Sequence, residues 1–342
     1  MKKVFLITGG AGFIGSHLAE NLLNAGHKVV ALDDFSTGKI ENVMPLKENP
    51  DFELVVGTVL NEYLVDKLIE KCDAVFHLAA AVGVELIVKK PLESLTTNIK
   101  GSEIVLEMAH RYNKKILITS TSEIYGKNTN GPLKENDDRI LGSPLKTRWG
   151  YSTAKAVDEM LAYVYWKNKR VPSIIVRLFN TVGPRQTGVY GMVMPRFISQ
   201  ALENKPITVF GTGKQTRCFL HVKDAVSAIV KLMNEEKAVG DVFNIGSQEE
   251  ISIEGLAKNI IKITKSNSKI EYIPYDKAYE EGFEDMQRRV PDINKINKLI
   301  GFSPTYSLME IIEDMISRLN NQKPQQRAPA QKSSLKQSGR KN

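Results

Sequence analysis

A tyrosine and a lysine four residues apart, Tyr151 and Lys155, are the pair of side chains in this sequence most suited to chemistry. They lie at the start of a segment whose pattern predicts a helix, so both side chains share one helix face. An ammonium beside a phenol favours the phenolate and lowers the pKa of the tyrosine. We therefore expect Tyr151 to act as a base near neutral pH, with Lys155 as its electrostatic support.

A polar group, Thr121-Ser122-Glu123, follows an apolar run that predicts a buried strand. Ser, Thr and Glu often end a strand or begin a helix, so a glutamate that only ties down a helix is one interpretation. In the other interpretation, Thr121 hydrogen-bonds the same substrate hydroxyl as Tyr151, and Glu123 takes part in the reaction. These residues alone leave both interpretations open.

A glycine-rich segment, Thr8 to Gly15, lies between a predicted strand and a predicted helix. Gly9 permits a sharp turn, Gly12 lets the backbone approach a pyrophosphate, and Gly15 allows the helix to pack closely on the strand. The next strand ends in Asp33, whose carboxylate would accept hydrogen bonds from ribose hydroxyls and repel a 2′-phosphate. This combination predicts a dinucleotide site for NAD rather than NADP.

The run from Phe76 to Ala81 predicts a strand that ends in small residues, as required where the backbone passes close to a flat ligand. His77 in this run has no partner at a suitable spacing, so we interpret it as structural. The predicted cofactor contacts are Gly9, Gly12, Phe13, Ile14, Gly15, Asp33, Leu78, Ala79, Tyr151 and Lys155.

Short β-branched runs alternate with longer amphipathic segments through the first half of the chain. This alternation predicts an α/β fold with a doubly wound parallel sheet covered on both faces. We expect a Rossmann domain over 1–180, mainly a smaller α/β substrate-binding lobe over 181–319, and a disordered basic tail over 320–342. The predicted strands are Val4–Thr8, Lys28–Asp33, Ala74–Leu78, Ile116–Ser120, Ser173–Phe179, Ile207–Phe210 and Val242–Ile245. The predicted helices are Phe13–Ala25, Leu92–Tyr112, Tyr151–Lys169, Met194–Glu203, Val222–Asn234, Ile253–Thr264 and Leu308–Leu319.

Composition places the chain among ordinary globular proteins, with 42% hydrophobic and 25% charged residues in a length of 342. No apolar run approaches the roughly 20 residues that a spanning helix needs, and the N-terminus lacks the features of a signal peptide. The only cysteines, Cys72 and Cys218, cannot form a disulfide framework or a metal site by themselves. We expect a reducing cytoplasm, no membrane association and no bound metal.

The net charge of +8 comes mostly from the C-terminal tail. Six basic residues and no acidic residue occur after Asn320, and without these six the charge is +2. The tail is rich in Gln, Ser, Pro and Lys, a composition that cannot repay the entropy of ordering. We interpret it as a solvated tail and expect no nucleic-acid partner.

Taken together, these motifs resemble the extended short-chain dehydrogenase/reductase family, in particular its NAD-dependent nucleotide-sugar epimerases, dehydratases and decarboxylases. The resemblance runs from Lys3 to about Arg318. It implies that Asn180, in the segment Arg177 to Arg185, contacts the sugar nucleotide and that Arg217 binds its diphosphate. An arginine fork suits phosphate oxygens. Thr58 stands where the family usually has an aspartate that contacts adenine.

Glu123 separates the reactions of this family. The resemblance implies a common start, in which Tyr151 removes a proton from the C4 hydroxyl while hydride passes to NAD. Related 4-epimerases have Ser, Thr or Ala at the position of Glu123, and glucose 4,6-dehydratases have Asp-Glu where this chain has Ser122-Glu123. Thr-Ser-Glu occurs in hexuronate decarboxylases and GDP-mannose dehydratases. Glu123 therefore indicates chemistry at C5 or C6.

Two further segments resemble the decarboxylase branch. Arg148-Trp149-Gly150-Tyr151 is similar to its Arg-Trp-x-Tyr sequence, and Gly282 to Ile293 is similar to a segment whose arginine, here Arg289, lies at the reacting sugar. Gly188 to Pro195 is equally similar to epimerases. The favoured function is decarboxylation of UDP-glucuronate to UDP-xylose, with UDP-hexose or UDP-hexuronate 4-epimerisation second and 4,6-dehydration third.

The resemblance assigns the site as follows. Thr121, Glu123, Tyr151 and Lys155 are catalytic, and Ser122, Asn180, Arg217 and Arg289 bind the UDP-sugar. It also implies a homodimer paired through the helix that carries Tyr151, on which Met160, Tyr163 and Val164 are apolar. A non-catalytic NAD-sensing scaffold is the alternative from another class, but a sensor has no need of Thr121, Tyr151 and Lys155 together.

Overall fold

The computed structural model describes residues 1–82, 90–188, 192–278 and 286–322. Its largest element is a seven-stranded sheet with strand order β11-β6-β5-β4-β1-β2-β3, in which every neighbouring pair is parallel. The order reverses between β1 and β4, and ligands bind at such a reversal, outside the carboxyl ends of the strands. The predicted doubly wound fold is confirmed. The strands are β1 (Val4–Thr8), β2 (Lys28–Asp33), β3 (Phe52–Val56), β4 (Ala74–His77), β5 (Lys115–Thr121), β6 (Ser173–Leu178) and β11 (Val242–Ile245).

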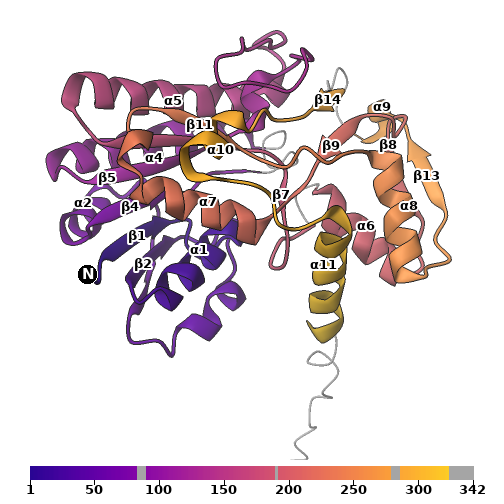
Figure 1. The fold of residues 1–342 in the computed structure, drawn as a ribbon, viewed down its shortest axis with the longest axis horizontal. Helices are drawn as coiled ribbons and strands as arrows, with labels where there is room; N and C mark the ends of the chain where they lie inside the picture. Colours follow the sequence, from indigo (N-terminus) through magenta and orange to yellow (C-terminus); the bar gives the residue numbers. More distant parts are fainter. Residues whose placement is uncertain (83–89, 189–191, 279–285, 323–342) are drawn as a thin grey trace, which may run out of the picture.

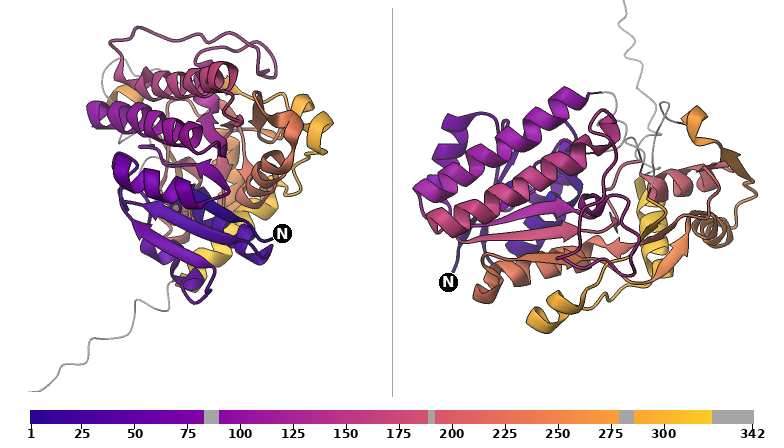
Figure 2. Two further views of the ribbon diagram at one scale, coloured as in Figure 1. Left: turned by 90° about the vertical axis from the view of Figure 1, so that its left-hand side faces the viewer. Right: turned by 90° about the horizontal axis from the view of Figure 1, so that it is seen from above.

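Helices cover both faces of this sheet, and Figures 1 and 2 show the resulting three layers. The two hydrophobic clusters on either side of the sheet include the apolar residues of β1, β4, β5 and β6, which alternate between the two faces. One face carries α1 (Phe13–Asn24), α7 (Val222–Asn234) and α10 (Asn294–Ile300). The other carries α2 (Glu62–Lys71), α4 (Pro91–Arg111) and α5 (Gly150–Lys169).

A smaller lobe lies beside the sheet and has a hydrophobic core of its own (Figure 1). Its elements are α6 (Val193–Leu202), β8 (Ile207–Phe210), α8 (Ile253–Thr264), β13 (Ile270–Ile273), α9 (Tyr275–Ala278) and α11 (Leu308–Gln322). Short strands connect it to the sheet: β7 (Thr181–Val182), β9 (Thr216–Cys218), β10 (Leu220–His221), β12 (Glu250–Ser252) and β14 (Arg288–Arg289). The 3-10 turns are η1 (Ile40–Asn42), η2 (Met44–Leu46), η3 (Ser122–Tyr125), η4 (Thr147–Trp149) and η5 (Glu236–Ala238).

The chain passes between these two parts more than once, which a single boundary at residue 180 does not capture. After 181 it forms α7 and the edge strand β11, both of which belong to the sheet and its covering layer. The C-terminal helix α11 continues to Gln322, so residues 320–322 are helical rather than part of a tail. The predicted tail over 323–342, residues 189–191 of the segment Gly188 to Pro195, and residues 282–285 of the segment Gly282 to Ile293 lie outside the described residues.

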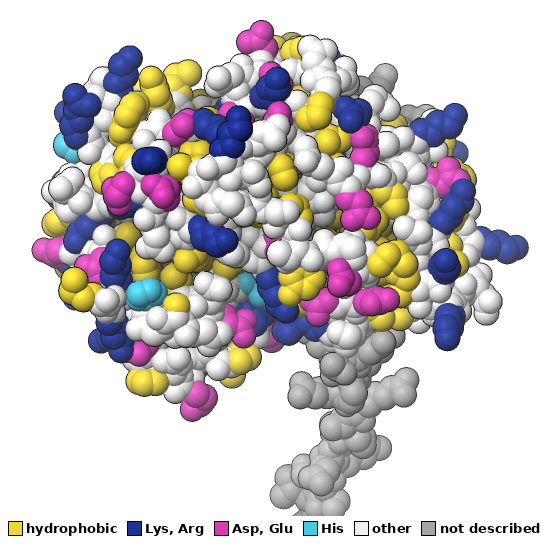
Figure 3. All heavy atoms as spheres, in the orientation of Figure 1, with side chains coloured by type: hydrophobic (Ala, Val, Ile, Leu, Met, Phe, Trp, Pro, Cys, Tyr) yellow, Lys and Arg dark blue, Asp and Glu magenta, His cyan; other side chains and the backbone are white. Residues whose placement is uncertain are grey.

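Surface charge among the described residues is mixed. On the face shown in Figure 3, Lys and Arg side chains are interspersed with Asp and Glu. In the described part of the chain, no helix combines the length and the apolar character needed to cross a membrane.

Candidate active site

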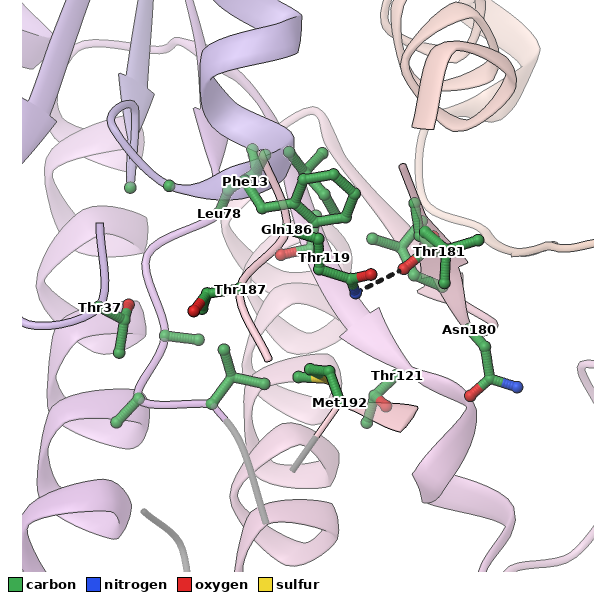
Figure 4. A pocket seen from close by; sticks show the side chains of 18 of the residues that line it. Phe13, Thr37, Leu78, Thr119, Thr121, Asn180, Thr181, Gln186, Thr187 and Met192 are labelled. Carbon is green, nitrogen blue, oxygen red and sulfur yellow. Dashed lines mark hydrogen bonds between the residues drawn. The ribbon is translucent and has the colours of Figure 1, made fainter. Parts of the chain in front are cut away.

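A cavity of about 460 Å³ opens where the carboxyl ends of the sheet strands meet the smaller lobe. The glycine loop, the ends of β2, β5 and β6, the start of α5, and residues of β9 and β14 all line it. Figure 4 shows part of this lining, with Phe13 and Leu78 near the glycine loop and Thr121 and Asn180 further along the cavity. Sequence segments far apart in the chain therefore converge on one space.

The glycine loop can pack this closely at the start of α1 only because side chains are absent. A Cβ on Gly15 would lie 2.1 Å from the carbonyl oxygen of Gly9, and a Cβ on Gly9 would lie 2.8 Å from the amide nitrogen of Ala79. Gly9 also has a φ of +71°, which favours glycine. This cradle fits a dinucleotide diphosphate at the N-terminus of a helix.

Asp33, the last residue of β2, is hydrogen-bonded to the glycine loop. Its Oδ2 accepts a hydrogen bond from the amide of Ala11 at 2.9 Å, and its Oδ1 accepts one from the amide of Phe35 at 2.8 Å. The carboxylate lines the cavity. The hydroxyl of Thr58 accepts a hydrogen bond from the amide of Leu60, and Thr58 is not among the lining residues, unlike its neighbours Gly57 and Val59.

Tyr151 and Lys155 lie on the buried face of α5, but the electrostatics differ from the prediction. Burial, and then the negative charges of Glu123 and Asp158, raise the pKa of Tyr151 above its usual range. The ammonium of Lys155 donates to Oδ2 of Asp158 at 3.0 Å, and both side chains are almost fully buried. The expected lowering of the tyrosine pKa is therefore wrong for this state of the protein, because burial raises the pKa and the charges of Glu123 and Asp158 raise it further.

His77 is buried on β4 and serves packing, as predicted. Its Nδ1 hydrogen-bonds the hydroxyl of Thr8 at 2.8 Å, and its Nε2 hydrogen-bonds that of Ser102 at 3.1 Å. Burial, with a smaller contribution from the charge of Lys155, lowers the pKa of His77 to about 3. The ring is therefore neutral at physiological pH.

Glu123 lies between two arginines in the wall of the cavity. Nη1 of Arg148 donates to its Oε2 at 2.6 Å, and Nη1 of Arg289 lies 3.7 Å from its Oε1. Burial raises the pKa of this carboxyl, but the charges of Arg148, Arg289 and Arg217 outweigh burial and hold the pKa below its usual range. Glu123 is therefore ionised, and the cavity keeps an excess of positive charge around it.

Two of these arginines occupy neighbouring strands. β14 pairs with β9 in parallel, which places Arg289 opposite Arg217. Nη2 of Arg289 donates to Oδ1 of Asn180 at 2.6 Å, and the amide group of Asn180 donates to the carbonyl oxygen of Cys218. The two arginines and Asn180 form one connected group at the cavity wall.

The remaining predicted residues also line the cavity. Thr121 accepts a hydrogen bond from the amide of Glu123 at 3.2 Å, so its hydroxyl caps the turn η3, and Ser122 is buried beside it. Figure 4 shows Thr121, Asn180 and Met192 among the side chains that line the cavity. The lining residues contain every predicted catalytic, cofactor-binding and substrate-binding residue except Lys155, which lies behind Tyr151.

Sequence reasoning missed three participants. Only the resemblance points to Arg148, although an arginine three residues before the predicted base Tyr151 is a usable signal. Asp158 follows Lys155 by three residues, so the helical spacing could have predicted the ion pair. Arg185 lines the cavity and has a φ of +72° and an almost fully buried side chain. Its Nη2 binds Glu20 at 2.6 Å, whereas its Nε and Nη1 have no hydrogen-bond partner among the described residues. A diphosphate would supply acceptors for such a group.

Comparison with known proteins agrees with this site. Residues 6–315 match the family model for GDP-mannose 4,6 dehydratase. The chain belongs to this family. A UDP-N-acetyl-alpha-D-glucosaminuronate decarboxylase of Bacillus cytotoxicus is 42% identical over 92% of this chain and 97% of its own length. UDP-glucuronic acid decarboxylase 1 of Danio rerio is 35% identical over 99% of this chain and 79% of its own length.

Solved structures similar to this chain also include enzymes that act on nucleotide sugars. A UDP-glucuronic acid 4-epimerase from Bacillus cereus, in complex with UDP-glucuronic acid and NAD, is 33% identical and superposes with a TM-score of 0.84 over 93% of this chain and 99% of the other. The predicted family is therefore confirmed, and so is NAD as its cofactor. As a member of the GDP-mannose 4,6-dehydratase family, the chain is an NAD-dependent enzyme of nucleotide-sugar chemistry.

Replacing Gly15 with alanine tests the cofactor cradle. We expect Gly15→Ala to weaken NAD binding at least about tenfold, because the new Cβ overlaps the Gly9 carbonyl and overpacking costs about 1–3 kcal/mol. Titration calorimetry with NAD measures the loss. Gly26→Ala, at the other end of α1, is the control: it has a φ of +81° but open space around it, so it should cost stability without changing NAD affinity. Equal NAD affinity in Gly15→Ala and wild type would contradict this assignment.

Proposed function

We propose that this protein decarboxylates a UDP-hexuronate, converting UDP-glucuronate to UDP-xylose through a 4-keto intermediate. The observation that carries the proposal is the group of three arginines around Glu123, next to Tyr151. The similarity to two uronate decarboxylases over most of the chain supports the same reaction. The 42% identical relative acts on the 2-acetamido uronate, so this analogue is the second candidate substrate.

The charge of the cavity fits an anionic sugar nucleotide. Among the described lining residues, six basic side chains outnumber three acidic ones: Lys39, Arg148, Arg185, Arg196, Arg217 and Arg289 against Asp33, Asp34 and Glu123. A nucleoside diphosphate and a C6 carboxylate supply the matching negative charges. Guanidinium groups bind both kinds of oxygen through paired hydrogen bonds, so Arg217 is suited to the diphosphate and Arg289 to the carboxylate.

Glu123 would keep the carboxylate from being held too firmly. Binding that is equally strong in the ground state and the transition state does not speed the chemical step. The carboxylate loses its charge as carbon dioxide leaves, so a purely cationic pocket would stabilise the substrate more than the transition state. The fixed negative charge of Glu123 among the arginines reduces this excess stabilisation of the substrate.

The proposed reaction begins at C4. Tyr151 takes the proton of the C4 hydroxyl as hydride leaves that carbon, which produces a ketone β to the carboxylate. Bound NAD would supply the hydride acceptor and later return the same hydride, so the reaction is redox-neutral. The C5–C6 bond then breaks, carbon dioxide leaves, and its electron pair remains on C5 as an enolate until a proton adds there. Hydride returns to C4, and Tyr151 returns its proton to the oxygen.

The other residues would position these groups. Thr121, next to the cavity, aligns the C4 hydroxyl, and Lys155 supports Tyr151 and contacts the ribose of the cofactor. Ser122 and Asn180 contact the sugar nucleotide, and the smaller lobe contributes most of the substrate contacts. The glycine loop, Asp33, Leu78 and Ala79 hold the cofactor.

Product analysis tests the reaction. Purified protein incubated with NAD and UDP-glucuronate should release carbon dioxide and yield a UDP-sugar lighter by that amount, as read by mass spectrometry. The same assay with UDP-N-acetylglucosaminuronate compares the two candidate substrates through kcat/KM. A product of unchanged mass but altered retention would indicate 4-epimerisation and contradict decarboxylation, as would a product lighter by one water. The Tyr151→Phe variant is the inactive control.

Removing Arg289 tests carboxylate recognition. We expect Arg289→Met to raise the dissociation constant of UDP-glucuronate at least about 30-fold, since truncating one partner of a buried charge pair costs about 2–5 kcal/mol. UDP-glucose, which lacks the carboxylate, is the matched control ligand and should bind the variant and the wild type alike. An equal loss of affinity for both ligands would show that Arg289 does not recognise the carboxylate.

We also propose that two copies of the chain pair through α5. Met160, Tyr163 and Val164 are 68%, 45% and 42% exposed and share one face of this helix. Leu92, at the start of the neighbouring helix α4, is 78% exposed. Apolar side chains of this size are gathered here at the surface, which is typical of an interface.

Charged substitution tests the dimer. Met160→Asp combined with Val164→Asp should convert a dimer into a monomer, because two carboxylates would be buried without partners. Light scattering coupled to size-exclusion chromatography measures the mass. Tyr63→Asp, at a 74% exposed position on α2, is the control and should leave the mass unchanged. A monomeric wild type would refute the proposal.

The cysteines favour the cytoplasm as the compartment. Cys72 and Cys218 are both free and buried, and burial raises the pKa of the first to about 11 and of the second to about 12. Unpaired thiols of this kind are typical of a reducing environment.

A further inference from the structure

Asp158 forms a buried ion pair with Lys155, and this carboxylate has no part in the function proposed so far. Lys155 and Asp158 expose 2% and 0% of their side chains, and the ammonium donates to Oδ2 of Asp158 at 3.0 Å. Within the described residues, Asp158 is the only acceptor of a hydrogen bond from this ammonium. Oδ1 of Asp158 has no hydrogen-bond partner in the described part of the chain. A buried carboxylate with one oxygen left without a hydrogen bond destabilises the fold. Packing alone therefore does not explain why an aspartate occupies this position.

Helical spacing places this pair directly in line with the reactive phenol. Tyr151, Lys155 and Asp158 follow one another at intervals of four and three residues, so they form one stripe on the buried face of α5. Asp158 is buried completely, and its charge is one of the two that raise the pKa of Tyr151. The carboxylate therefore acts on the phenol as well as on the ammonium.

We propose that Asp158 is a positioning residue, which fixes the Lys155 ammonium and offsets its charge so that Tyr151 keeps its proton until a further positive charge enters the cavity. The inference rests on the proposed function of Tyr151 as the base. With Asp158 present, the lysine and the aspartate form a neutral unit, and Glu123 is compensated by its arginines. The oxidised nicotinamide ring, when bound, carries the additional positive charge.

The charged and titratable groups around Tyr151 come from each element packed against α5. β4 contributes His77, which is neutral, and α4 contributes Glu107 and His110, which lie against Tyr165 in the second half of the helix. The remaining groups are Glu123 on η3, Arg148 on η4, Arg177 on β6 with its partner Glu159 on α5, and Arg139, whose guanidinium donates to the carbonyl oxygens of Ile124 and Ser152. Each of these charged side chains near Tyr151 has its own partner. The Lys155–Asp158 pair therefore determines the net charge that acts on the phenol.

Removing the carboxylate should shift the titration of the phenol. In Asp158→Asn the ammonium keeps a hydrogen-bond acceptor but loses its counter-ion, and the Tyr151 phenolate, one helical turn away on the same face of α5, is the group that we expect to replace it. A buried charge without a partner is strongly unfavourable, so the variant favours the pair of phenolate and ammonium. We expect the Tyr151 tyrosinate to appear at a pH lower by at least about one unit than in the wild type.

Ultraviolet absorbance of tyrosinate measures this shift without substrate. The chain has 11 tyrosines, so each spectrum is taken as a difference between a protein and its Tyr151→Phe counterpart, with and without NAD, below the pH of unfolding. Glu107→Gln is the matched control, because it also removes a carboxylate that bonds α5, at Tyr165, and it should leave the Tyr151 signal unchanged. Asp158→Ser replaces Asp158→Asn if the amide variant does not fold.

The pH profile of kcat/KM is the second readout. A lowered phenol pKa moves the rising, acidic limb of the profile to lower pH, whereas a merely structural loss lowers the whole profile without moving it. An onset of tyrosinate at the same or higher pH in Asp158→Asn overturns the inference even if the enzyme decarboxylates its substrate. Absence of decarboxylation refutes the proposed function but leaves the tyrosinate titration as an independent measurement.

Discussion

The carboxylate of Glu123 joins two parts of the chain that have separate hydrophobic cores. Arg148 approaches it from the turn before α5, and Arg289 approaches it from β14 at the edge of the smaller lobe. All three side chains are largely buried, so each charge requires the others for compensation. This part of the cavity can form only when the sheet and the lobe are together. Charge compensation therefore sets the geometry of the site as much as apolar packing does.

The same constraint explains how α5 carries charge on its buried face. Lys155 is held by Asp158, and Glu159 accepts two hydrogen bonds from Arg177 on β6, at 2.9 and 2.8 Å. Each pair would be expensive if one partner were missing. As pairs, they fix the rotation of the helix against the sheet, and this rotation determines where the phenol of Tyr151 lies. A rigid helix with locked neighbours is the kind of support that a reactive side chain needs.

Features that depend on neighbouring residues could be predicted from the sequence. The glycine loop, Asp33 after β2, and Tyr151 four residues before Lys155 each have a local signal, and the seven predicted strands have observed counterparts within two residues at either end. Features that depend on contacts between residues far apart in the chain could not be predicted from the sequence. Nothing in the run Val242–Ile245 says that it pairs with β6, and no local rule joins Glu123 to Arg289. The direction of the Tyr151 pKa shift was wrong because it depends on burial and on Asp158, which the sequence pattern does not reveal.

Fold alone cannot separate the reactions of this family, since a solved 4-epimerase superposes on nearly the whole chain. The distinction must come from the side chains that meet C5 and C6 of the sugar. An epimerase has to hold a uronate carboxylate unchanged through both hydride transfers, so strong cationic binding does it no harm. A decarboxylase must release the same group as a neutral molecule, so part of the cationic field has to be cancelled. In the proposed reaction, Glu123, ionised and placed between Arg148 and Arg289, would supply this cancellation.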